Sequence, residues 1–228
     1  MRASSVIQAI GEINRPVFTS REVANIRSGS ISATSQSLAL LSEQGIVKKI
    51  TRGVWALPSH PYFSPYMVLS FLAPGQRAYV SFLSALHLHG LIEQIPQVIY
   101  AATTGRGRIV NTSVGVYSFH QLSPRIFGGC KWYGKREDFL IAEPEKALVD
   151  SLYISSRKNK RFGIFPELHF GPGFDFQQAR SWANRIPDKR IRGYVINSLD
   201  RIKATAQSSS AQRDSRNTLV RTSKNSGQ

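Results

Sequence analysis

The hydrophobic residues at the start of the chain recur at helical spacing. Apolar side chains at positions 6, 7, 10 and 13 share one side of a helix, and Pro16 follows them. Because proline cannot continue a helix interior, this spacing predicts a helix over residues 3–14 that ends before Pro16. We expect this helix to complete a small three-helix core.

A capping box predicts where the second helix begins. Thr19 and Glu22 have the required spacing, so a helix should start directly after Thr19. Its apolar residues, Ile26 included, are expected to turn inward. Residues 27–29 (RSG) should then turn the chain sharply, because glycine and serine at this point do not favour a continuing helix.

A third helix and a basic hairpin complete this region. The helix should start near Ser32, bury Leu38 and Leu41 together with Ala39, and end at Gly45 in the left-handed conformation. The β-branched residues at 46–50 (IVKKI) and 54–57 (VWAL) predict two strands joined by a short turn. Helix, tight turn, helix and hairpin in this order are typical of a winged helix-turn-helix domain.

We therefore expect a domain over residues 1–58 that binds double-stranded DNA. The third helix would present short hydroxyl and amide groups to phosphates and base edges, and among them only Gln36 can bond an adenine edge bidentately. The hairpin would place positive charge beside the duplex backbone. The alternative is a solvated helix face and a hairpin that only covers a small core. The predicted DNA-binding residues are Arg27, Ser30, Ser32, Thr34, Ser35, Gln36, Lys48, Lys49 and Arg52.

The rest of the chain predicts a second, larger domain. Prolines at 58, 61 and 65 indicate a hinge, and residues 59–204 mix strand and helix patterns. The expected fold class is thus α+β: a winged helix-turn-helix followed by a mixed α/β domain. Residues 205–228 are so poor in apolar side chains that they are expected to be a disordered tail. The clearest predictions are strands at 98–102, 114–119 and 139–142, and helices at 66–73, 144–153, 175–185 and 187–204.

The charge balance favours a polyanionic partner. The 228 residues hold 30 Lys and Arg against 14 Asp and Glu, a formal net charge of +16. Such an excess is typical of nucleic-acid-binding proteins. Cys130 is the only cysteine, which rules out an internal disulfide. The chain has neither a signal-peptide pattern nor a run of apolar residues long enough for a membrane span, so we expect a cytoplasmic protein without membrane contact.

Exposed basic loops in the second domain are a further candidate surface. Arg106, Arg108, Arg157, Lys158, Lys160 and Arg161 are predicted as additional phosphate contacts. Residues 189–192 (KRIR) extend the same pattern. The alternative is that these side chains form solvated faces that keep the protein in solution, and the sequence does not decide between the two.

No motif supports a catalytic, metal or cofactor site. Glu143, Glu145 and Lys146 resemble the acidic-x-lysine end of a nuclease site, but the spacing fails and residue 144 is proline, which favours a structural role. Asp150 lies four residues after Lys146 and is expected to be its ion-pair or hydrogen-bond partner. His87 and His89 would point about 200° apart on a helix, too far to share a metal. We expect no enzyme activity.

Four segments together resemble one protein family. They are GIVKKITRGVWAL (45–57), YVSFLSALHLHGLIEQIP (79–96), VYSFHQLSPRIFGG (116–129) and IAEPEKALVDSLY (141–153). In this order they resemble the AbiE-type antitoxins (AbiEi family) of bacterial abortive-infection, type IV toxin–antitoxin systems. The last segment is the most specific and carries the family's antitoxin-domain motif, here Glu143, Glu145, Lys146 and Asp150.

The resemblance implies a transcriptional repressor that binds its own promoter and counteracts a cognate toxin. In that family the toxin is nucleotidyltransferase-like and is neutralised without a stable complex. The chain departs from the family at Trp55, where tyrosine is usual, and in its polar segment after residue 205. Two alternatives stay open: a nucleic-acid-processing enzyme targeted by a winged helix, and a protein-interaction module without a toxin partner.

Overall fold

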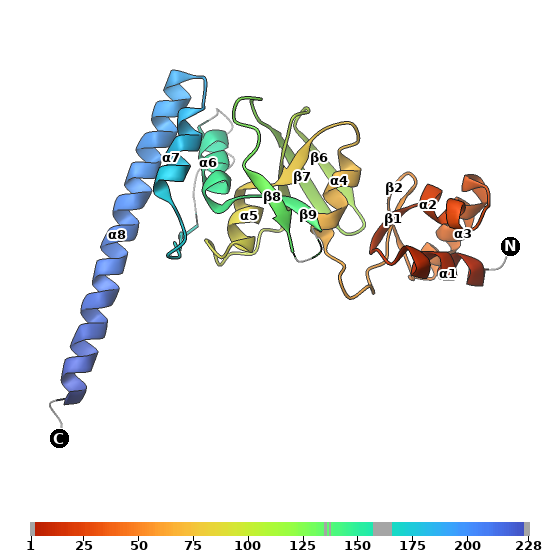
Figure 1. Cartoon of the computed structure of the whole chain (residues 1–228), viewed down its shortest axis with the longest axis horizontal. Coiled ribbons are helices and arrows are strands. Elements are labelled where there is room, and N and C mark those ends of the chain that lie inside the picture. Colours follow the sequence, from red (N-terminus) through yellow and green to blue (C-terminus); the bar gives the residue numbers. More distant parts are fainter. Residues whose placement is uncertain (1–2, 135, 137, 157–165, 226–228) are drawn as a thin grey trace. The chain divides into compact units, whose positions relative to one another are not determined.

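The computed structural model describes residues 3–134, 136, 138–156 and 166–225. Within these ranges the chain is mixed α+β, with eight α-helices, one 3-10 helix and two sheets (Figure 1). None of the helices in the described ranges is both long enough and apolar enough to cross a membrane. The chain divides into two compact units. The first comprises Met1–Val80, Gln97–Leu122 and Lys131–Ile141, and the second Ser81–Pro96, Ser123–Cys130 and Ala142–Gln228.

The first unit begins with three helices and a three-stranded antiparallel sheet. The sheet has the order β1-β3-β2, so the strand before α2 pairs with the last strand of the hairpin. The boundary expected after residue 58 lies inside this unit. The elements are α1 (Ala3–Ile13), β1 (Val17–Thr19), α2 (Ser20–Ile26), α3 (Ile31–Glu43), β2 (Lys48–Thr51) and β3 (Val54–Ala56).

Side chains from every one of these helices, with β1, β3 and the residue before β2, fill one core. Its buried members are Val6, Ala9, Ile10, Phe18, Val23, Leu38, Leu41, Val47 and Trp55. Two residues expected inside lie outside: Ile26 is 42% exposed and Ala39 is exposed. Leu38 and Leu41 already define the buried side of α3, and Ala39 is turned about 100° from Leu38.

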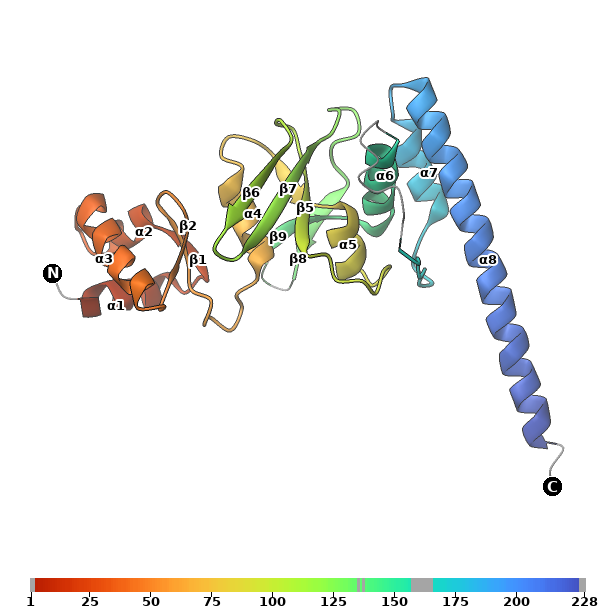
Figure 2. The same ribbon diagram turned by 180° about the vertical axis from the view of Figure 1, so that it is seen from behind.

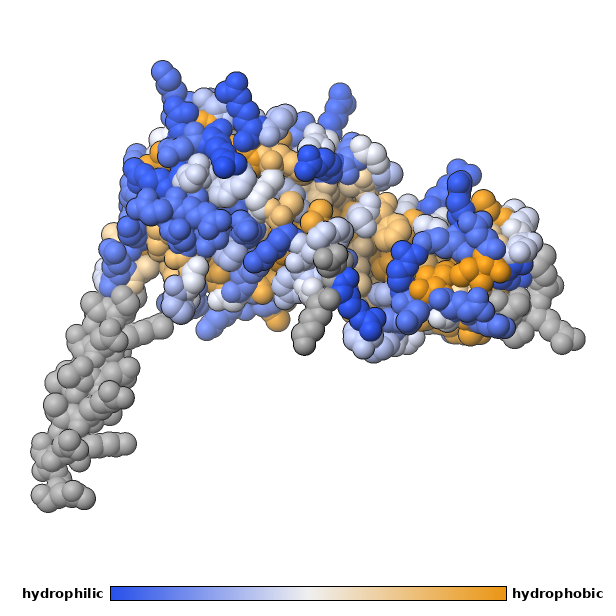
Figure 3. Space-filling view, in the orientation of Figure 1, coloured by the Kyte–Doolittle hydropathy of each residue, from blue (hydrophilic) through white to orange (hydrophobic). Residues whose placement is uncertain are grey.

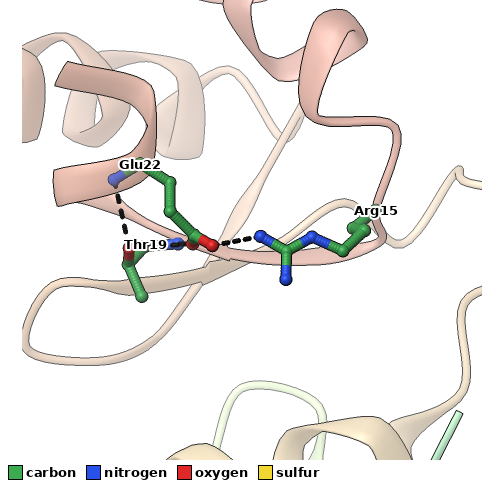
Figure 4. Close-up of polar contacts among 3 residues, drawn as sticks. All are labelled: Arg15, Thr19 and Glu22. Atoms are coloured by element: carbon green, nitrogen blue, oxygen red, sulfur yellow. Dashed lines mark hydrogen bonds and ion pairs between the residues drawn. The ribbon is translucent and has the colours of Figure 1, made fainter. Parts of the chain in front are cut away.

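The capping box predicted at the start of α2 is present (Figure 4). The hydroxyl and the backbone N–H of Thr19 both donate to a carboxylate oxygen of Glu22, at 2.8 and 2.7 Å, and the Glu22 N–H donates back to the Thr19 hydroxyl at 3.2 Å. Arg15 forms an ion pair with the same carboxylate. Burial alone would raise the pKa of Glu22, but these hydrogen bonds and the Arg15 charge together hold the pKa below its usual 4.5.

A mixed six-stranded sheet, of order β6-β7-β5-β4-β9-β8, forms the rest of the first unit. β5 runs parallel to β7 and β4 parallel to β9, while β4–β5 and β6–β7 are antiparallel. The strands predicted near 98–102, 114–119 and 139–142 are confirmed as β5, β7 and β9. The Tyr117 hydroxyl donates to the carbonyl of Pro65 at 2.6 Å and so fixes η1 to the sheet. The elements are η1 (Pro65–Val68), α4 (Leu69–Leu72), β4 (Ala78–Val80), β5 (Val98–Thr103), β6 (Arg108–Thr112), β7 (Gly115–Gln121), β8 (Cys130–Tyr133) and β9 (Phe139–Ala142).

The second unit is helical, with α5 (Phe82–Leu88), α6 (Pro144–Ser155), α7 (Phe176–Asn184) and α8 (Lys189–Asn225). α7 packs along the first part of α8, as both views show (Figures 1 and 2). α8 continues as far as Asn225, through the segment from Thr205 for which the composition predicts disorder. The segment contains no proline or glycine, and it extends a helix that is already formed and packed, so no new helical nucleus is needed.

The charge of Glu22 should stabilise the protein in a pH-dependent way. Because the folded pKa lies below the ordinary value, the contribution is complete above pH 4.5 and is lost as the pH falls through the folded pKa. We expect Glu22→Gln to lower the free energy of unfolding by less than about 1 kcal/mol at neutral pH, as for a partly exposed charge. Urea unfolding at several pH values measures this difference.

The exposed Glu43 near the end of α3 supplies the control, since Glu43→Gln removes a charge without removing a cap. The difference between wild type and Glu22→Gln should shrink toward zero in acid. A difference that stays constant from neutral to acidic pH would show that the carboxylate charge is not what stabilises the cap.

Candidate nucleic-acid interface

One side of α3 is buried and the opposite side is exposed. Thr34, Leu38 and Leu41 face the core, spaced four and three residues apart. On the outward side, an exposed α3 stripe repeats at the same helical spacing. We define this stripe as Ser32, Gln36, Ala39, Leu40 and Glu43. Its groups are a hydroxyl, an amide, apolar side chains and one carboxylate, so α3 brings no positive charge of its own.

Two of the predicted DNA contacts on α3 are engaged within the domain. Thr34 is completely buried and accepts a hydrogen bond from Nη1 of the half-buried Arg27 at 3.4 Å. Ser35 is half-buried, and its hydroxyl donates to Oγ of Ser20 at 3.0 Å. The prediction that Thr34 faces DNA is therefore corrected, because Thr34 precedes Leu38 by four residues and shares its buried side. Ser35 is only half-buried, and its hydroxyl is bonded to α2.

A buried hydrogen-bond chain joins α2, α3 and the hairpin. The indole N–H of Trp55 donates to Oγ of Ser20 at 2.8 Å, and Ser35 donates to the same oxygen. This small network sets the angle of α3 relative to β3, because the three side chains come from three different elements. The sequence offered one hint of it, since a tryptophan inside a short strand must find a partner for its N–H when buried.

The hairpin carries the cations that α3 lacks. Lys48 and Lys49 are exposed on β2, and Arg52 is exposed in the turn between β2 and β3. Gly53 has φ +74°, a conformation that permits the tight turn. Nζ of Lys49 lies 5.9 Å from the centre of the Trp55 ring, so this lysine is held near the hairpin surface. Ser30, another predicted DNA contact, lies at the start of α3 and caps this helix: its hydroxyl accepts a hydrogen bond from the N–H of Ala33 at 3.1 Å.

The basic residues predicted as phosphate contacts in the second domain differ in exposure and in the contacts they make. Arg106 is exposed. The guanidinium of Arg108 instead donates to the carbonyl of Leu72 at 2.7 Å and to Oε1 of Gln76 at 3.2 Å, and it stacks 4.6 Å above the Phe119 ring. These contacts give Arg108 a structural role within the sheet. Arg157, Lys158, Lys160 and Arg161 lie outside the described residues.

The motif at the start of α6 forms a buried polar cluster. Lys146 and Asp150 are both completely buried and form the ion pair that their spacing predicts. Ser81 donates to the other oxygen of Asp150 at 2.7 Å, and Nζ of Lys146 lies 5.3 Å from the centre of the Trp182 ring. Because Trp182 belongs to α7 and Ser81 precedes α5, this pair connects three helices of the second unit.

The two glutamates of the motif reach the N-terminal end of α7. Glu145 accepts from the N–H of Asp175 at 2.9 Å, and Glu143 accepts from Nε2 of Gln178 at 3.1 Å. All four motif residues therefore hold helices together. Gly129 lies directly against the Trp182 ring, because a Cβ at this position would be only 2.5 Å from the ring. Its φ of +65° also favours glycine.

The described residues contain no group of three or more His, Cys, Asp or Glu side chains that could hold a metal ion. The Nε2–H of His89 donates a hydrogen bond to the carbonyl of Ala142 at 2.8 Å, so this ring nitrogen is not a metal ligand in the structure. The chain matches no protein-family model and no curated protein. Arguments about function therefore depend on the side chains themselves.

Breaking the buried pair should be far more harmful than breaking an exposed one. Asp150→Ala leaves Lys146 buried without its counter-ion, so we expect a loss of about 3–5 kcal/mol in the free energy of unfolding. The triple variant Ser81→Ala, Lys146→Met, Asp150→Leu removes every charge and should recover most of that loss. Urea titration followed by tryptophan fluorescence measures both.

The control is Asp200→Ala, which breaks the exposed ion pair with Arg180 (2.7 Å). Its effect should be about 1 kcal/mol or less. If Asp150→Ala and Asp200→Ala destabilise the protein equally, the motif does not hold the second unit together as described.

Proposed function

We propose that the N-terminal part of the chain is a winged helix-turn-helix that binds double-stranded DNA. The observation that carries the proposal is the pairing of two surfaces on one small body: the exposed α3 stripe and the three exposed cations of the hairpin. The element order α1-β1-α2-α3-β2-β3 with sheet order β1-β3-β2 supports it, because it allows α3 to enter a major groove while the hairpin lies beside it.

The two surfaces would divide the work of recognition. Lys48, Lys49 and Arg52 would contact phosphates, which carry affinity but no sequence information. Ser32 and Gln36 would face base edges, with Gln36 suited to an adenine through its amide. The absence of any cation on α3 favours this division, since α3 then contributes little to non-specific attraction.

The repressor and antitoxin roles are proposed in addition to DNA binding. They rest on the four segments that resemble AbiE-type antitoxins, and they add that the DNA is the protein's own promoter. They also add that a nucleotidyltransferase-like toxin is counteracted. In cells whose growth is arrested by the product of an adjacent toxin gene, coexpression of this chain should restore growth. Growth arrest that persists at full expression would exclude the antitoxin role while leaving DNA binding untouched.

Removing hairpin cations should weaken binding to all duplexes alike. For Lys49→Ala with Arg52→Ala, we expect the slope of log affinity against log salt to become less negative by about 2, because each lost phosphate contact removes about 0.9. Fluorescence anisotropy with a random-sequence duplex and with promoter DNA measures both slopes. The control is Arg125→Ala with Lys131→Ala, which removes two exposed cations that do not belong to the hairpin. If the hairpin variant and the control variant show the same slope of log affinity against log salt, the hairpin is ruled out as a phosphate contact.

Gln36→Ala should change sequence preference more than affinity for random DNA. Losing a bidentate contact should reduce discrimination at one base pair by about 1–3 kcal/mol. Selection of bound sequences from a random pool, with wild type and variant in parallel, measures this position by position. Ser32→Ala tests the neighbouring position on the stripe. An unchanged preference in the Gln36 variant would remove this residue from base readout.

A further inference from the structure

A hollow of about 340 Å³ lies in the first unit, and all of its lining residues belong to that unit. Its walls come from the segment between α1 and β1, from η1 and α4, and from β8, β9 and residues between these two strands. Pockets that bind small molecules have volumes of about 300–1,000 Å³, so this hollow is large enough to hold one.

Two exposed aromatic side chains line the hollow. Tyr62 is 51% exposed and Trp132 is 53% exposed, and the described residues contain only one other exposed Phe, Tyr or Trp side chain. Exposed rings that gather at one hollow, rather than lying scattered over the surface, favour a binding site. Phe139 adds a third, nearly buried ring, which stacks with Tyr66 and Tyr133 at centroid distances of 5.3 and 5.0 Å. This wall is therefore well packed before any ligand arrives.

The charged side chains around these rings are Arg15, Arg136 and Asp138. Arg15 already forms an ion pair with Glu22 (Figure 4). Arg136 is exposed, and its guanidinium carbon lies 3.8 Å from the centre of the Tyr62 ring. A guanidinium that stacks on a ring keeps its N–H groups in its own plane, where they can donate to an anion. The hollow thus combines aromatic faces with a cation held beside them.

This combination decides which class of ligand the hollow suits. An inorganic anion would leave the exposed rings unused, and a neutral hydrocarbon would leave Arg136 unused. A planar aromatic molecule with an anionic group uses both, and Asp138 can accept a hydrogen bond from an N–H or hydroxyl group of the same molecule. On the face drawn in Figure 3, apolar residues form small patches among hydrophilic ones, and a small molecule needs no broader patch.

We propose that this hollow binds a small planar aromatic molecule that carries an anionic group, the chemistry shared by a mononucleotide and an aromatic carboxylate. The ring of the ligand packs against Trp132 and Tyr62, and its anionic group binds Arg136. The site is separate from α3 and the hairpin, and it does not depend on DNA binding by either of them.

The test is calorimetric titration of the full chain with two matched pairs of probes: adenosine monophosphate with adenosine, and indole-3-acetate with indole. We expect an anionic probe to bind, and its uncharged partner to bind about tenfold more weakly or worse, since hydrogen bonds between charged groups are the strong ones. Binding of the nucleotide alone, or of the carboxylate alone, identifies which source of this chemistry the hollow accepts.

Exposed residues of the hollow can be changed without disturbing a core. Trp132→Ala should weaken binding of the anionic probe by about 5–100-fold, because it removes a stacking surface. Arg136→Ala should weaken it by about tenfold and abolish the preference over the uncharged partner. The matched control, Arg190→Ala with Tyr194→Ala, removes an exposed cation and an exposed aromatic ring that do not line the hollow, and it should leave the affinity unchanged.

The Lys49→Ala, Arg52→Ala variant separates this site from the hairpin, and it should bind the probe as wild type does. A loss of affinity in that variant, with none in Trp132→Ala, would place the probe on the hairpin and overturn the proposal. Failure of both anionic probes to bind at millimolar concentration overturns it too, as does an uncharged partner that binds equally tightly. None of these results would change the expectation that the N-terminal part binds DNA.

Discussion

The hydrogen bond from the Trp55 indole to Ser20 is the contact on which the proposed DNA surface depends. It joins the hairpin to the first residue of α2, and Ser35 brings α3 to the same oxygen. A buried indole N–H without a partner costs about 1–3 kcal/mol, so this arrangement is strongly preferred over others that bury Trp55 equally well. The angle between α3 and the hairpin is therefore fixed by hydrogen bonds among three side chains from three different elements.

Much of the N-terminal fold could be predicted because its signals are local. The capping box at Thr19 and the left-handed Gly45 depend only on neighbouring residues, and both are present. Which hydroxyls face outward could not be read in the same way. Thr34 and Ser35 are as polar as Ser32, and their inward position follows from the register of α3 against Leu38 and Ser20. The exposed stripe, with Ala39 and Glu43, emerges only from that register.

In the second unit, tertiary contacts decide more of the structure than local sequence signals do. The spacing of Lys146 and Asp150 predicted their pairing, but not that both would be completely buried or that Ser81 and Trp182 would surround them. For α8 the polar composition argues for disorder from Thr205, while the helix continues to Asn225. Positive charge consequently serves two purposes in this chain. The buried Lys146 holds helices together, and the exposed cations on the hairpin are available to phosphates.

The central claim, that α3 and the hairpin bind a DNA duplex, is tested most directly by nuclear magnetic resonance. Amide signals of the isotope-labelled full chain would be followed while a duplex is added at low salt. The account predicts that the largest shifts fall on the exposed face of α3 around Ser32 and Gln36 and on the turn at Arg52. Signals of α3 and the hairpin that stay in place while the DNA is bound elsewhere, or is not bound at all, would contradict it.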